Sequence, residues 1–131
     1  MPADSIELKR SVLVTAIMTP AFRQQLIVEA RESIRRLDES LALVSEALAS
    51  ASEASSGAAQ ALLEEQSRLT RQKGEVEWRV REIEGVADEA EMPFRTIEST
   101  VQVRVGDDFL LRMAQAEVVL RDWKVVEIRK P

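Results

Sequence analysis

The middle of the chain carries apolar residues at spacings that alternate between three and four positions. This alternation places one narrow apolar seam along a helix and is typical of coiled coils. The first seam consists of Ile27, Ala30, Ile34, Leu37, Leu41, Val44, Leu48 and Ala51. A second seam repeats every seven residues at Leu62, Leu69, Val76, Ile83 and Ala90, with a companion row of Ala59, Gln66, Lys73, Val80 and Ala87. The sequence therefore predicts two long helical segments.

The two seams match each other in a way that favours an antiparallel hairpin. In such a hairpin the residue numbers of facing positions add to a constant. The pairs Ala51–Leu62, Val44–Leu69, Leu37–Val76 and Ala30–Ile83 each add to 113, which places the fold point between Ser56 and Gly57. The alternative is one continuous helix of about 100 Å, at 1.5 Å per residue, dimerised in parallel. That helix keeps a row of Leu48, Ser55, Leu62 and Leu69, but it would bring Glu65, Gln72 and Arg79 into the seam.

Both ends of the chain show a period of two instead, which indicates β-strands. Residues 5–18 alternate and are rich in β-branched side chains, and Thr19 followed by Pro20 is a typical helix start. Near the other end, Val101, Val103 and Val105 alternate with polar residues. We therefore expect an α+β protein with one domain over residues 1–131. A strand at 5–18 precedes a coiled-coil stalk of helices 20–54 and 58–91, and a β segment at 95–130 completes a small antiparallel sheet.

The C-terminal segment also resembles a known family. The runs Val105-Gly106-Asp107-Asp108 and Ala116 to Asp122, followed by Val125 to Ile128, are similar to the YlqD family of small, functionally uncharacterised bacterial proteins. In this sequence Trp123 stands where a glycine usually follows the turn aspartate. The resemblance implies the same order of strand, helical insert and closing strands. It implies no activity, cofactor or catalytic residue.

The amino-acid composition excludes the catalytic and metal-binding sites that depend on cysteine or histidine. The chain has no cysteine and no histidine, which excludes disulfides, thiolate metal sites and histidine-dependent triads. Asp107-Asp108 is the nearest approach to an active-site signature, and we interpret the pair as a turn and a helix N-cap in preference to a Mg²⁺ or Ca²⁺ site. We therefore expect no enzyme, no cofactor and no metal site. We also expect a cytoplasmic location without membrane contact.

Charge is unevenly distributed over the predicted stalk. The formal net charge is -5, and residues 38–67 contain acidic residues but no lysine or arginine. Beside this acidic tip lie the candidate phosphate contacts Arg31, Arg35, Arg36, Arg68 and Arg71. Such a belt could grip RNA, but a solvated face with ion pairs between neighbouring turns is the favoured interpretation.

Several large apolar residues lie outside the seams and need a partner. These are Leu26, Val28, Leu43, Leu63 and Trp78, together with Trp123 at the predicted turn. We expect Trp123 to be covered by its own domain or by a second subunit. We take Trp123, Trp78, Leu43 and Leu63 as candidate contacts with a partner or subunit, and we predict a homo-oligomer. The favoured function is a non-catalytic interaction or scaffold protein with an unidentified protein partner. An RNA- or ribosome-associated factor and a prefoldin-like holdase are the alternatives.

Overall fold

The computed structural model describes residues 2–51 and 56–130 and confirms the α+β architecture. The elements follow the order β1 (Ser5–Ile17), α1 (Pro20–Ala51), α2 (Ser56–Gly85), β2 (Glu91–Arg104), α3 (Phe109–Met113), β3 (Ala116–Arg121) and β4 (Lys124–Arg129). They form two compact units. The hairpin unit is Arg23–Gly85, and the sheet unit combines Met1–Phe22 with Val86–Pro131.

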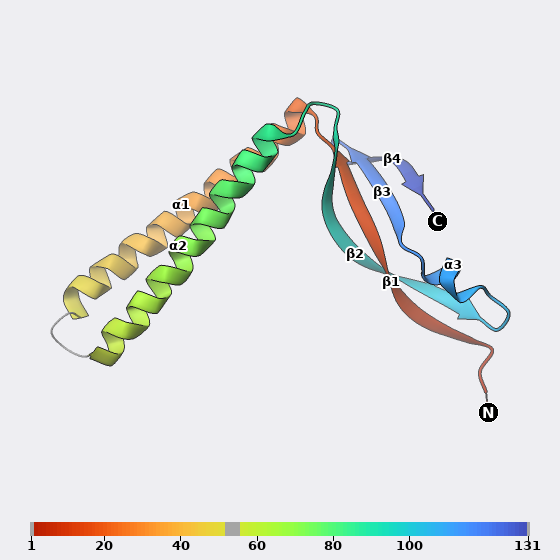
Figure 1. Ribbon diagram of the computed structural model, residues 1–131, viewed down its shortest axis with the longest axis horizontal. Coiled ribbons are helices and arrows are strands. Elements are labelled where there is room, and N and C mark those ends of the chain that lie inside the picture. The colour runs from red at the N-terminus through yellow and green to blue at the C-terminus, as the bar shows by residue number, and fades with distance from the viewer. Residues whose placement is uncertain (1, 52–55, 131) are drawn as a thin grey trace. The chain divides into compact units, whose positions relative to one another are not determined.

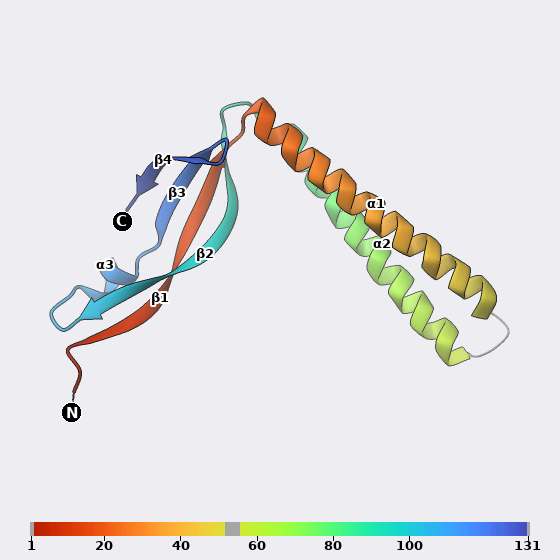
Figure 2. The same cartoon turned by 180° about the vertical axis from the view of Figure 1, so that it is seen from behind.

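The hairpin unit consists of α1 and α2, which run antiparallel and side by side (Figures 1 and 2). The helical positions of both predicted seams are buried or half-buried, and Ile27, Ala30, Leu69 and Ile83 are the most enclosed of them. The predicted hairpin is confirmed and the continuous helix is wrong, because α1 and α2 are two helices that run antiparallel. Coiled-coil packing of the two seams stays a prediction.

Polar contacts join the two helices. Near the start of α1, Arg23 Nη1 donates to the carbonyl oxygen of Ile83 at 2.5 Å. Further along, Lys73 Nζ of α2 lies 2.7 Å from Asp38 Oδ1 of α1. The hydrogen bond to Asp38 raises the pKa of Lys73 above its ordinary value. The polar seam residue Lys73 thus forms an ion pair with the facing helix, as expected of a residue that fixes the register of the two helices.

Two predicted boundaries of the second helix are wrong. The helix begins at Ser56, so Gly57 lies in its first turn and not at the fold point. It ends at Gly85 and not at residue 91, because glycine disfavours helix and readily ends one. The next residues pair with the strand region instead, since Met18 N donates to the carbonyl of Ala90 at 2.8 Å and Glu89 N donates to the carbonyl of Met18 at 2.7 Å. Residues 52–54 of the predicted first helix lie outside the described part.

The described strands form one four-stranded sheet in the order β2-β1-β3-β4 (Figure 1). The predicted all-antiparallel sheet is wrong in one pairing: β1 pairs antiparallel with β2 but parallel with β3, and β4 runs antiparallel to β3. The difference arises because the chain leaves β2 beside the start of β1 and passes through α3 to the other edge of β1. From there β3 runs in the same direction as β1.

Strand β2 begins earlier than the alternation of valines indicates. It includes Pro93, which pairs with Thr15 next to an irregularity between Val14 and Thr15. Proline cannot donate a backbone hydrogen bond, but β2 is an edge strand, where that loss is tolerated.

The hairpin turn between β3 and β4 is held by an aromatic cluster. Asp122 and Trp123 both have positive φ, 48° and 69°, as a type I′ turn requires. The rings of Phe22, Phe94 and Trp123 meet edge to face with centroids 5.3–5.7 Å apart. The indole of Trp123 is therefore packed by its own sheet unit, although the residue stays 46% exposed.

Candidate functional site

The paired aspartates serve local structure. Asp108 Oδ1 accepts from the backbone N–H of Leu111 at 3.2 Å, so Asp108 is the N-cap of α3. Asp107 Oδ2 accepts from Arg104 N at 2.7 Å and from Arg112 Nε at 3.2 Å. The backbone bond from Arg104 lowers the pKa of Asp107 first, and Arg112 adds to the effect. Among the described residues no group of three metal-ligating side chains is found.

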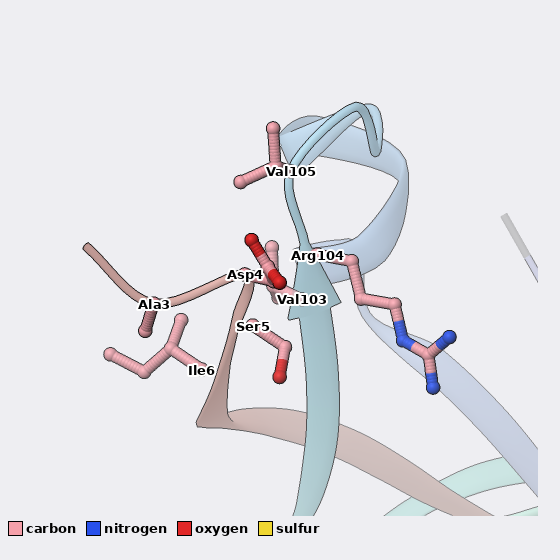
Figure 3. A pocket seen from close by; sticks show the side chains of 7 residues that line it. All are labelled: Ala3, Asp4, Ser5, Ile6, Val103, Arg104 and Val105. Atoms are coloured by element: carbon pink, nitrogen blue, oxygen red, sulfur yellow. The ribbon is translucent and has the colours of Figure 1, made fainter. Parts of the chain in front are cut away.

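A hollow of about 400 Å³ lies where the start of β1 meets the end of β2 (Figure 3). Its lining residues are Ala3, Asp4, Ser5, Ile6, Val103, Arg104 and Val105. In Figure 3 the guanidinium of Arg104 points away from Ile6 and Val105. Four of the seven lining residues, Ala3, Ile6, Val103 and Val105, are apolar, so the hollow offers a mainly apolar surface.

The predicted contact residues of the hairpin unit are exposed. Leu43 is 66% exposed, Leu63 47% and Trp78 58%. Trp78 Nε1 donates to Glu82 Oε1 at 2.6 Å, and the guanidinium carbon of Arg81 lies 5.5 Å from the ring centroid. The indole is therefore held in place while much of the side chain faces solvent. Leu26, which was expected to need a partner, is buried, and that expectation is wrong.

Three of the five candidate phosphate-binding arginines pair with carboxylates of their own helix. Arg35 binds both Glu32 and Glu39, Arg36 Nε lies 3.5 Å from Glu32 Oε1, and Arg68 Nε donates to Glu65 Oε2 at 2.9 Å. The hydrogen bond from Arg35 lowers the pKa of Glu32, and the hydrogen bond from Arg68 lowers that of Glu65.

Arg31 and Arg71 differ from these three. Over residues 2–51 and 57–130, neither guanidinium has an ion-pair partner. The positive charge of the belt is thus largely balanced within each helix, which lowers its attraction for phosphates.

The sheet carries an apolar surface that the sequence did not assign to a site. Residues paired directly across a sheet point to the same side. The pairings of β1 with its neighbours therefore put Val12, Val14, Ala16, Ile97, Val118, Leu120, Val125 and Ile128 on one side, the aliphatic face. The central members from β1 are buried, whereas Ile97, Val125 and Ile128 on the edge strands are 44%, 58% and 61% exposed. The alternation of β1 signalled this face, but the partners of β1 did not follow from the sequence.

The opposite face of the sheet is covered by its own charged side chains. Arg129 of β4 reaches Glu91 of β2 at 2.5 Å, Glu117 of β3 at 3.3 Å and Glu127 at 2.9 Å. Glu117 also accepts a 2.5 Å hydrogen bond from the buried Thr15 hydroxyl. The hydrogen bond from Arg129 lowers the pKa of Glu91. One face of the sheet is therefore closed by this Arg129 network, and the other presents aliphatic edges.

No helix within the described residues is both long enough and apolar enough to cross a membrane.

Comparison with known proteins supplies a family and a fold. The family model described as "YlqD protein" matches residues 6–129. A crystal structure of a protein of unknown function from Synechococcus sp. WH 8102 superposes with a TM-score of 0.81 and 20% sequence identity, covering 96% of this chain and 95% of that one. At that identity the similarity shows the fold alone. No curated protein matches the chain.

Proposed function

The chain belongs to the YlqD family, and we propose that it is a non-catalytic, oligomeric interaction or scaffold protein of the cytoplasm. The observation that carries the proposal is the set of large apolar side chains that both units expose. Leu43, Leu63 and Trp78 stand on the hairpin unit, and Ile97, Val125 and Ile128 stand on the sheet unit. Apolar side chains that gather into an exposed patch commonly mark contact with other protein surfaces, so we take these residues as the candidate contacts.

Trp78 is the best anchor of the hairpin unit for a protein partner. Tryptophan and arginine are enriched among the residues that contribute most to binding, and Arg81 lies beside the Trp78 ring. The Glu82 hydrogen bond fixes the indole before any partner arrives. A fixed side chain loses less conformational entropy on binding than a mobile one.

The charge distribution favours a protein partner over RNA. An RNA-binding surface needs cations that are free to contact phosphates, and Arg35, Arg36 and Arg68 already pair with glutamates of their own helices. Arg31 and Arg71 remain as the candidates for that alternative.

The test is affinity capture with the intact protein and a variant in which Leu43, Leu63 and Trp78 are replaced by serine, glutamate and alanine respectively. The proposal predicts that the intact protein retains a defined protein in high salt and that the triple variant loses it. The matched control is Arg31→Gln combined with Arg71→Gln, which should retain the same protein.

Two other results would contradict the proposal. Capture of RNA that falls steeply with salt and needs Arg31 and Arg71 would favour the RNA-associated factor. Suppression of aggregation of many unrelated clients, without a defined partner, would favour the holdase.

A further inference from the structure

The aliphatic face is buried at its centre, where Val12, Val14 and Ala16 are 8%, 7% and 1% exposed, and is open along its two edge strands, β2 and β4. Besides its strands, the described sheet unit contains the short α3 and the first residues of α1. Arg10 of β1 points to the aliphatic side and donates from Nη1 to the carbonyl oxygen of Arg112 at 3.3 Å. The C-terminal end of α3 therefore lies beside Arg10 on this side of the sheet. The edge residues Ile97, Val125 and Ile128 stay exposed.

The α3 helix, whose end contacts Arg10 on this side of the sheet, adds further exposed apolar side chains. Phe109, Leu110 and Leu111 are exposed, as is Ile6, which pairs with Val103 on the aliphatic side of the β1–β2 ladder. The cationic Arg95 of β2 does not interrupt the surface strongly, because its guanidinium carbon lies 4.6 Å from the centroid of its own neighbour Phe94.

We propose that the exposed edges of the aliphatic face, together with α3, form the contact between two copies of this chain. The inference deepens the proposed function and rests on its oligomeric part. A two-fold contact uses the same patch on both copies.

The available area suits such a dimer. Seven exposed side chains contribute to it: Ile6, Ile97, Phe109, Leu110, Leu111, Val125 and Ile128. At roughly 60–120 Å² for each large apolar side chain, allowing for their partial burial, they offer on the order of 400 Å². A standard interface buries about 800 Å² per partner, of which roughly 60% is apolar. The apolar surface on each copy is therefore close to what a stable dimer buries.

The edge residues of β4 provide the test. Val125→Lys combined with Ile128→Lys places two cations in the contact, where they would be buried without partners. The dimer dissociation constant should rise about 100-fold or more. Lysine is tolerated on exposed edge strands, so each chain should keep its fold. Val28→Lys is the matched control, because Val28 of α1 is 54% exposed, close to the 58% of Val125, and lies in the other unit.

Sedimentation equilibrium over a range of concentrations measures all three proteins, and circular dichroism checks their folds. The inference expects a dimer for the native chain and for Val28→Lys, and a monomer for the double variant at the same concentration. If the double variant folds and dimerises as tightly as the native chain, the proposed contact surface is wrong, whereas the proposal that the chain forms an oligomer still stands. A native chain that stays monomeric would overturn both. If the double variant does not fold, Ile97→Lys on the opposite edge decides by the same two results.

Discussion

The hydroxyl of Thr19 joins the start of α1 to the turn between β3 and β4. Thr19 Oγ1 accepts from the backbone N–H of Phe22 at 3.1 Å and donates to Asp122 Oδ1 at 2.5 Å. The side chain is buried, so a lost partner could not be replaced freely by water. One polar group therefore caps a helix and anchors a β-turn more than 100 residues away along the chain.

Replacing Thr19 tests this double role. Thr19→Val keeps the shape but removes the cap and leaves Asp122 without its donor, which should lower the free energy of unfolding by about 1–3 kcal/mol. Thr19→Ser keeps the hydroxyl and should lose less. Urea unfolding measures both variants, and equal losses would show that the hydroxyl is not what stabilises this junction.

The positive φ of Trp123 leads us to expect that its glycine variant is more stable than its alanine variant. Both Trp123→Ala and Trp123→Gly remove the ring contacts with Phe22 and Phe94. At a φ of 69°, however, alanine is strained and glycine is not. The glycine variant should therefore be the more stable of the two, by about 1 kcal/mol. Thermal or urea unfolding gives the comparison, and a more stable alanine variant would contradict the assigned turn.

The Arg129 network predicts a loss of stability in acid. Arg129 lowers the folded-state pKa of Glu91 below its usual 4.5, so the unfolded chain binds more protons in this range. The stabilisation is present above the unfolded pKa and is lost as the pH falls through the folded one. Stability should thus decline below about pH 5, and Arg129→Gln should flatten that decline.

Lys130→Gln is the control for Arg129→Gln, because it removes one positive charge from the next residue. Urea unfolding of the native chain and both variants at neutral and acid pH measures the effect. If Arg129→Gln and Lys130→Gln change the acid slope equally, the network is not the cause.

The ion pair between Asp38 and Lys73 tests the antiparallel hairpin. Asp38→Lys should lower the unfolding midpoint, because it places two cations opposite each other across α1 and α2. Combining Asp38→Lys with Lys73→Asp should restore much of the loss. A double-mutant cycle measures the coupling. Absence of any recovery would contradict the facing of these two residues.

The hairpin was predictable from the sequence because its period is local. Every turn of α1 repeats the same spacing, so Ile27, Ala30 and Leu37 identify their face without knowledge of any partner. The aspartate cap at Asp108 was predictable for a similar reason, since N-caps act within three residues.

The arrangement of the strands was less predictable, because it depends on contacts between distant segments. The alternation in β1 gives its two faces but does not say that Val14 pairs with Val118 in parallel. Gly85 ends α2 although the heptad continues to Ala90, which shows that local backbone preference and sheet pairing prevail over the apolar period there. The exposed Val125 and Ile128 became candidate contacts only once β4 was placed at an edge.

We propose that this YlqD-family chain works by association, beginning with its own second copy. The molar mass of the intact protein in solution, measured by light scattering across micromolar concentrations, tests it most directly. We expect a mass of at least twice the 14.7 kDa of one chain, falling towards 14.7 kDa as the protein is diluted. A mass of 14.7 kDa at every concentration would contradict it.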